Sequence, residues 1–209
     1  MRRTALLTLS ALVLATTACS TTNPGRPSPS SGTTSTNGSP EDGTAVPGPG
    51  VPKVQHPVDV TRFKRAPCDA LNATQITELL GSAVSGKSDP QAPAGPSCAW
   101  DSSDVSQAGV AVIFTAADKL GLTSVYAAQG KQYQFFQPLA TIDGFPIVAY
   151  GVSDERTTRG RCAVALGVSD TQAVDIHVAQ SEDNIGRKDP CDAAHDIASQ
   201  VLSNLRGAN

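Results

Sequence analysis

The sequence of 209 residues predicts an α+β domain in which helices pack on one antiparallel sheet. Two observations support this fold class. Apolar residues alternate with other residues over 162–168 and again over 174–178, which is typical of an antiparallel hairpin. Near both ends of the same region, apolar residues recur every three or four positions, as on one face of a helix. Strands flanked by helices in this order predict a layer of helices on a sheet.

The first predicted helix begins after Asn72, a residue type that favours the N-cap position. Gln75 lies three residues further on and completes a capping-box pattern, while Leu71 and Ile76 occupy the positions of a hydrophobic staple. Gly81 follows the last apolar residue of the segment. We expect it to end the helix in the left-handed conformation.

The segment Gly81 to Ser88, GSAVSGKS, fits the phosphate-loop pattern G-x-x-x-x-G-K-[ST] at every fixed position. A phosphate loop needs a strand before its first glycine and a helix that starts at its Lys-Ser pair. Here a helix is predicted before the glycine, and the prolines of residues 89–96 prevent a helix from following. We therefore interpret the match as a chance one and expect no nucleotide to bind.

The middle of the domain predicts further strands over 97–101 and 110–114, and two more between 136 and 152 around a turn. A second helix is expected to start at Thr115, with Asp118 three residues on, although a glycine at 121 weakens this prediction.

The last helix has the clearest signal. Asp189 is expected to cap it, and Pro190 fits the first turn, where the missing N–H is not needed. Apolar residues then form one continuous face between Ala194 and Leu205.

Residues 1–18 have the pattern of a secretory signal peptide, with a basic start and an uncharged apolar stretch that is too short to span a bilayer comfortably. The segment ends at Ala18 and Cys19, which resembles a bacterial lipobox, although Thr16 departs from the usual aliphatic residue. The resemblance implies that Cys19 carries a diacylglycerol after cleavage and anchors the protein to the membrane. The alternative is an ordinary signal peptide with Cys19 as a spare thiol.

Residues 19–59 are expected to form a lipidated N-terminus and a disordered linker, because Ser, Thr, Pro, Gly and Asn dominate and no aromatic residue occurs. The single domain is expected over 60–209. Loss of residues 1–18 removes two arginines and no acid, so the net charge of −3 becomes −5. This acidic balance argues against nucleic acid as a partner.

Four cysteines remain once Cys19 is lipidated, and an even number in an exported chain predicts disulfides. Three pairings are possible. We favour Cys68 with Cys98 and Cys162 with Cys191, so that each bridge joins the start of a helix to a strand; the crossed arrangement is the main alternative. Because the chain has no C-x-x-C and no closely spaced cysteines, we expect neither a redox centre nor a metal site.

Four short motifs in a fixed order carry a resemblance to a known family. They are Cys68-Asp69-Ala70-Leu71, Cys98-Ala99-Trp100, Gly160-Arg161-Cys162-Ala163-Val164 and Asp189-Pro190-Cys191-Asp192-Ala193-Ala194. With them, residues 60–206 resemble the actinobacterial exported lipoproteins of domain-of-unknown-function family 3558. The resemblance implies an exported lipoprotein with this cysteine framework, and the family supplies no general activity and no catalytic residues.

Candidate catalytic groups are few. His177 shares a predicted strand face with Asp175, and His195 follows Asp192 by three residues on the last helix. Neither histidine has a second His or Cys near it in sequence, so we expect polar surface positions and no metal site. The hydrolase and metalloprotease motifs are absent, so the sequence predicts neither an enzyme nor a cofactor.

Most aromatic residues gather in one region of the chain, where core packing is expected and an apolar groove for a lipid or partner is the alternative. They are Tyr126, Tyr133, Phe135, Phe136, Phe145 and Tyr150.

Together these features predict an exported lipoprotein on the outer face of the plasma membrane, with its domain extending into the cell wall. The domain is expected to be non-catalytic and to bind a small apolar ligand or an envelope protein. The alternatives are an accessory sensor subunit for a membrane kinase or transporter and, third, a secreted hydrolase built from residues that are distant in sequence.

Overall fold

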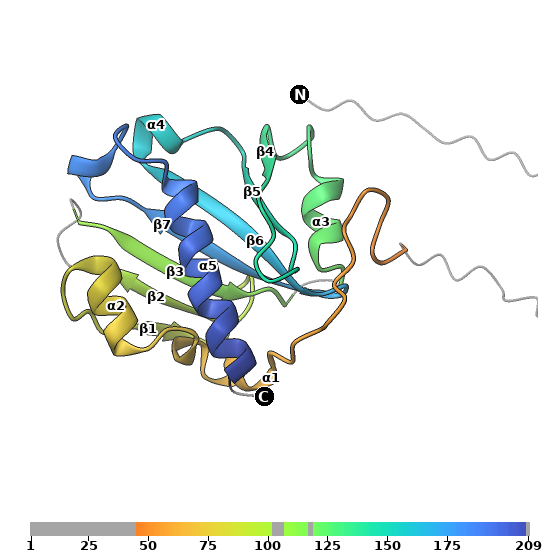
Figure 1. Cartoon of the computed structure of the whole chain (residues 1–209), viewed down its shortest axis with the longest axis horizontal. Helices are drawn as coiled ribbons and strands as arrows, with labels where there is room; N and C mark the ends of the chain where they lie inside the picture. The colour runs from red at the N-terminus through yellow and green to blue at the C-terminus, as the bar shows by residue number, and fades with distance from the viewer. Residues whose placement is uncertain (1–44, 102–106, 117–118, 208–209) are drawn as a thin grey trace, which may run out of the picture. The chain divides into compact units, whose positions relative to one another are not determined.

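Seven antiparallel strands form one sheet in the computed structural model, which describes residues 45–101, 107–116 and 119–207 (Figure 1). The strand order is β1-β2-β3-β7-β6-β5-β4, so the late hairpin β6–β7 lies in the middle, between β3 and β5. The strands are β1 (Lys87–Asp89), β2 (Ser97–Asp101), β3 (Gly109–Phe114), β4 (Phe135–Pro138), β5 (Ile147–Gly151), β6 (Arg161–Ser169) and β7 (Gln172–Ala179).

Short helices and one long helix surround this sheet and confirm the predicted α+β class. They are α1 (Thr61–Arg65), η1 (Pro67–Ala70), α2 (Ala73–Leu80), α3 (Leu122–Ala127), α4 (Arg156–Arg159), η2 (Glu182–Asn184) and α5 (Pro190–Gly207). None of the helices in the described part of the chain is long and apolar enough to cross a membrane.

The helix α5 covers one face of the sheet, across β6 and β7 (Figure 1). Its apolar side is buried from Ala194 to Leu205 and meets the alternate residues of the central hairpin, such as Val164 and Ile176. Successive side chains of a strand point to opposite faces of the sheet, so the apolar alternation that predicts these strands also predicts which of their residues lie in the main core.

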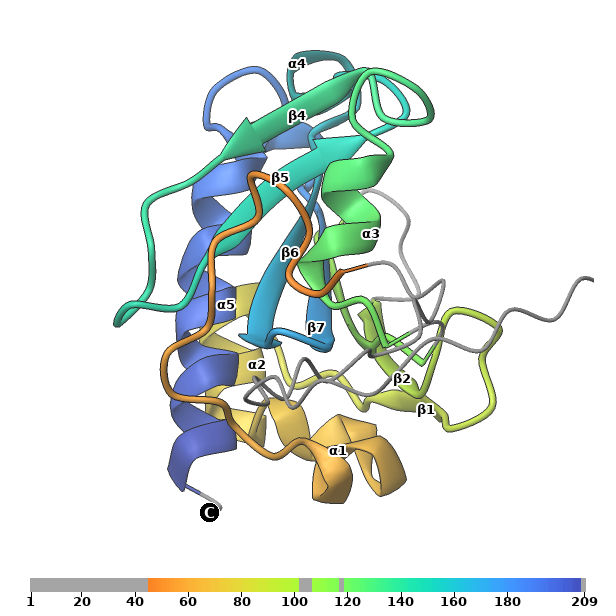
Figure 2. The ribbon, with the colours of Figure 1, turned by 90° about the vertical axis from the view of Figure 1, so that its right-hand side faces the viewer.

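The opposite face of the sheet is covered at one end by α3, so α3 and α5 lie on opposite sides of β6 (Figure 2). Leu122 and Val125 of α3 pack there on Val148, Ala165 and Ala173. The rest of this face combines small side chains with larger ones such as Tyr150 and His177, and it forms the candidate site below.

The predicted capping box of the first helix is confirmed in α2. The Asn72 side chain accepts a hydrogen bond from the Gln75 backbone N–H at 3.0 Å, and the Gln75 side chain accepts one from the Asn72 backbone N–H at 2.8 Å. Gly81 ends the helix with φ 71°, in the left-handed region. These local signals place the helix correctly because they depend only on neighbouring residues.

The second helix does not begin at Thr115, as the sequence pattern predicts, but at Leu122, with Gly121 before it. The Thr115 hydroxyl instead donates a hydrogen bond to the Ala173 carbonyl at 2.9 Å, beside the central hairpin. Asp118 lies outside the described residues. The Thr115 side chain therefore makes a long-range hydrogen bond and does not cap the helix that the local sequence predicts.

Residues 45–59 belong to the folded domain, which corrects the predicted linker boundary at residue 59. Gly48 N–H donates to the Thr123 hydroxyl at 3.0 Å, Val54 N–H to the Asp170 carboxylate at 2.9 Å, and Val58 N–H to the Val168 carbonyl at 2.9 Å. Figure 2 shows this segment in orange, running along the domain from the side of α3 to α1. The remaining linker, the signal peptide and Cys19 lie outside the described residues and stay predictions.

Candidate functional site

The part of the second sheet face that α3 leaves uncovered holds a hollow of about 480 Å³. The pairing register explains its floor. Ala111, His177, Ala163 and Tyr150 form one row across β3, β7, β6 and β5. All four line the hollow, and two of them are alanines, so the surface between the larger side chains is recessed.

A second row extends the floor to the end of the sheet. Gly109, Ala179 and Arg161 are paired across β3, β7 and β6, and all three line the hollow. Asp101 of β2 lies directly against this row, because a Cβ atom on Gly109 would collide with its carboxylate oxygen. Glycine at 109 thus lets an acidic group lie over the floor.

The wall of the hollow on the β5 side is formed by residues 151–153 and Glu155, which follow that strand. Val152 is 68% exposed there, and it is the one large apolar side chain that stands out in solvent among the described residues. Glu155 is paired with Arg159 at 3.4 Å. The wall therefore combines an apolar residue with a carboxylate that already has an ion-pair partner.

Asp175 lies one row beyond the floor, between the hollow and the apolar cluster under α3. It is half-buried, its Oδ1 is fully buried, and no hydrogen-bond donor in the described part of the chain reaches that atom. Burial raises the pKa of Asp175 to about 7, while a hydrogen bond from the Tyr150 side chain acts in the opposite direction. At neutral pH this carboxyl group is therefore close to its titration midpoint.

Tyr150 lies between Asp175 and the hollow. Its side chain interacts with Asp175 and also lines the hollow. Its ring lies 4.7 Å from the Tyr133 ring, with an angle of 51° between the planes. Burial is the main reason that the pKa of each phenol is raised, and the Asp175 carboxyl adds to both shifts. Both phenols therefore stay neutral at physiological pH.

His177 takes the face that the sequence predicts, the one opposite Val174, Ile176 and Val178. It stays accessible from the hollow, although partial desolvation lowers the pKa of its ring, so the neutral imidazole is favoured at pH 7. No hydrogen bond to His177 is found among the described residues. The structure thus places this histidine inside a candidate site, where the sequence suggested an ordinary surface position.

His195 has a structural contact that the sequence did not indicate. Its Nε2 lies 2.8 Å from the Ala140 carbonyl, in the loop between β4 and β5. The residue therefore ties α5 to that loop, and it is not part of the hollow.

The aromatic region splits between the two faces of the sheet. Phe145 is buried in the main core and Phe135 packs beside it, whereas the other four members of the set pack under or near α3. Tyr126 and Phe136 meet edge to face at 5.0 Å. Most of these aromatic side chains pack against the core, as the sequence predicts, but Tyr150 and Phe135 also line the hollow.

The segment Gly81 to Ser88 has the inverted context that the sequence predicts. The helix α2 precedes it, and Lys87 and Ser88 begin the edge strand β1 where a phosphate loop would begin a helix. A Cβ atom on Gly86 would lie 2.6 Å from Cys98 Sγ and 2.9 Å from Cys68 Sγ. Gly86, the second glycine of the pattern, is therefore needed because the backbone passes close to the Cys68–Cys98 disulfide at this position.

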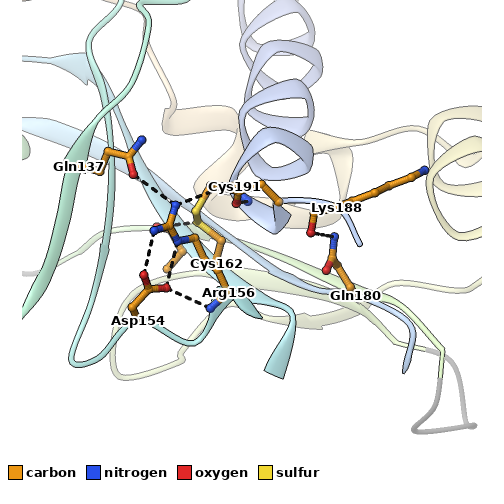
Figure 3. Close-up of a disulfide and its surroundings, with 9 residues drawn as sticks. Gln137, Asp154, Arg156, Cys162, Gln180, Lys188 and Cys191 are labelled. Carbon is orange, nitrogen blue, oxygen red and sulfur yellow. Dashed lines mark hydrogen bonds and ion pairs between the residues drawn. A yellow bond between two sulfur atoms is a disulfide. The ribbon is translucent and has the colours of Figure 1, made fainter. Parts of the chain in front are cut away.

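Both favoured disulfides are present, with Cα–Cα distances of 5.0 Å for Cys68–Cys98 and 5.2 Å for Cys162–Cys191. The first joins η1 to β2, and the second joins β6 to the first turn of α5 (Figure 3). Asp189 caps this turn as predicted, because its carboxylate accepts the Cys191 N–H at 2.8 Å.

Arg156 reinforces the same corner of the fold (Figure 3). It pairs with Asp154 at 2.8 Å and with Asp189 at 3.1 Å, and its guanidinium lies 4.5 Å from the centre of the Phe135 ring. It thereby links α4 and β4 to the start of α5. In the described residues, no group of three or more His, Cys, Asp or Glu side chains is arranged to hold a metal ion.

The fold and the site define a disulfide-bonded α+β domain with a hollow on one face of its antiparallel sheet. The chain belongs to the family described as proteins of unknown function, DUF3558, whose family model matches residues 14–204. The family resemblance seen in the sequence is thereby confirmed. No curated protein and no solved structure shows significant similarity to the chain.

Proposed function

We propose that this protein is a membrane-anchored extracytoplasmic lipoprotein whose domain binds a small ligand in the hollow on the open sheet face. The observation that carries the proposal is the pair of floor rows, in which alanine and glycine leave room above the central strands. A volume of about 480 Å³ is in the range of small-molecule sites. Tyr150, Val152 and Phe135 supply apolar surface for the ligand.

Binding explains the hollow better than catalysis does. His177 has no hydrogen-bonded carboxylate or hydroxyl partner in the described part of the chain, so no pair of nucleophile and base is assembled there. The two disulfides suit an exported protein, because such bonds persist in oxidising compartments. We therefore assign the domain a non-catalytic role outside the cytoplasm.

The test of binding is native mass spectrometry of the full-length mature protein purified from its own host. We expect a bound small molecule, and we expect Ala163→Leu to reduce its occupancy by on the order of tenfold, or about 1.4 kcal/mol. Ala163 lies in the middle of the floor, so a leucine there fills the hollow without entering the main core.

Ala99→Leu is the matched control for this experiment. Ala99 lies on the same sheet face, paired with Ala111, but it does not line the hollow. The control is expected to keep the ligand. If Ala163→Leu retains the ligand as well as the control does, the hollow is not the binding site.

The membrane anchor has a separate test, which does not depend on the ligand. Replacing Cys19 with alanine removes the thiol that would carry the lipid, so most of the protein should move from the membrane fraction to the medium. Immunoblotting of both fractions measures the change, with Ser20→Ala as the control. Continued retention of Cys19→Ala on the membrane would contradict the anchor.

A further inference from the structure

We propose that the ligand of the hollow carries a cationic nitrogen, which binds Asp175 beside the aromatic rings of Tyr133 and Tyr150. This inference rests on the proposed function, because it names the chemistry of the ligand that binds at the same site. It is carried by the position of Asp175, by the uncompensated oxygen of its carboxyl group and by the aromatic surface next to it.

Asp175 and Tyr133 do not line the hollow themselves, but Asp175 lies one row beyond its floor on the same face of the sheet. On β7 it lies two residues before His177, and its pairing partners are Ile113 on β3 and Ala165 on β6. These neighbours have no polar side-chain atoms. The side chain of Tyr150 lines the hollow and interacts with Asp175, so it connects the two.

One oxygen of the Asp175 carboxyl group lacks the donor that usually accompanies a buried acid. Its Oδ1 is fully buried, and no donor from the described residues satisfies it. Burying such an oxygen without a hydrogen bond costs free energy, and a charged donor recovers more of that cost than a neutral one. A ligand with an ammonium or similar group supplies both the charge and the interaction that Asp175 needs.

Tyr133 and Tyr150 add a second feature that suits a cation. Their rings lie 4.7 Å apart at 51°, so the pair presents tilted aromatic surface beside the carboxyl group. Cations are attracted to the faces of aromatic rings, most strongly where water is partly excluded. A carboxylate combined with such rings is the chemistry that recognises organic ammonium groups.

Other charges near the hollow do not favour an anion. Among the described residues, Arg161 is the one cationic side chain that lines it, and it is exposed at the end of the sheet, where solvent screens its charge. Asp101 also lines the hollow, and Glu155 is neutralised by Arg159. The least screened charge at the site is therefore negative, once Asp175 is ionised.

Binding of a cation should depend on pH, because it requires the ionised form of Asp175. In the described part of the chain, the titratable groups that face this carboxyl group are Tyr150 and Tyr133, which stay neutral, and His177 on the same strand has a lowered pKa. With a pKa of about 7 for Asp175, the affinity should fall about tenfold between pH 8 and pH 6.

Isothermal titration of the full-length mature protein tests the inference with two probes of equal chain length, hexylammonium, which carries N–H donors, and hexane-1-sulfonate. At pH 8 we expect the cation to bind at least about tenfold more tightly than the anion. Asp175→Asn should remove both this preference and the pH dependence. Asp196→Asn, which changes an exposed acid of α5 that does not line the hollow, should leave both.

Asp175→Asn should also fold. Because the folded state raises the pKa of Asp175 from 3.8 to about 7, the fold loses stability as the pH rises through this range and stays at the lower stability above it, and asparagine avoids that cost. Thermal unfolding at pH 8 checks this point before the titrations are compared.

Two results would overturn the inference and leave the proposed function standing. One is tighter binding of the sulfonate, and the other is a preference for the cation that Asp175→Asn does not change. Failure of both probes, while native mass spectrometry finds a ligand that Ala163→Leu displaces, would also reject the cation and retain the hollow. A ligand that Ala163→Leu does not displace counts against the proposed function itself.

Discussion

Replacing Cys162 and Cys191 together with alanine is expected to lower the free energy of unfolding by about 3–4 kcal/mol. The two residues are 29 positions apart, so the bridge closes a loop that contains most of the central hairpin. Without the bridge, the unfolded chain gains the conformational freedom of that loop, and the folded state loses a link between β6 and the first turn of α5.

Urea-induced unfolding, followed by the fluorescence of Trp100, measures this change, since the chain has a single tryptophan. Because both cysteines of the bridge are replaced, neither is left as a free thiol that could form other bonds. The matched control is the Cys68 and Cys98 pair, which is 30 positions apart and should give a loss of similar size. If the variant without Cys162 and Cys191 has the same urea midpoint and the same dependence of the free energy of unfolding on urea as the wild type, the bridge does not stabilise the fold by restricting the unfolded chain.

The parts of the fold that could be predicted from sequence depend on local chemistry or on simple alternation. Asn72, Gln75 and Gly81 define α2 through contacts with their own neighbours. The β6–β7 hairpin follows from alternating apolar residues around a short turn. The sequence favours the observed disulfide pairing because each bridge joins the start of a helix to a strand, with the crossed arrangement as the alternative.

The candidate site could not be predicted in the same way, because its floor exists only once four strands are paired. Ala111 and Ala163 are separated by more than fifty residues in the chain, and alanine alone carries no signal of a binding site. The sequence placed Asp175 and His177 on one strand face. It could not show that small residues on the neighbouring strands leave those two side chains beside an open space.

The prediction that the linker extends to residue 59 is wrong for a related reason. The proline- and glycine-rich composition of this segment predicts disorder, because it offers little apolar surface. The folded segment is held instead by backbone N–H groups that reach Thr123, Asp170 and Val168. Composition does not reveal hydrogen bonds to residues that are distant in sequence.

Gly86→Ala is the second substitution with a large expected effect, a loss of about 1–3 kcal/mol of stability. Its Cβ atom would lie 2.6 Å from Cys98 Sγ and 2.8 Å from Trp100 Nε1. Both of those side chains are buried and the disulfide is covalently fixed, so neither can move aside cheaply. Urea unfolding measures the loss, and the fluorescence of Trp100 should change because the new methyl group meets its ring.

Lys87→Ala is the control that separates this explanation from a phosphate loop. In a phosphate loop the lysine contacts the phosphates, so its loss would abolish nucleotide binding, whereas the glycine serves to bring the backbone close. Here Lys87 is exposed on the edge strand β1, so its substitution should change stability by less than about 0.5 kcal/mol.

The two substitutions together decide what GSAVSGKS does in this chain. If ATP with Mg²⁺ raises the melting temperature of the wild type and Lys87→Ala cancels that rise, the segment binds a nucleotide and the structural account is wrong. If Gly86→Ala destabilises the domain while ATP has no effect on either variant, the glycine is required by the Cys68–Cys98 bridge. The approach of this chain to the disulfide favours the second result, because no side chain larger than hydrogen fits between them.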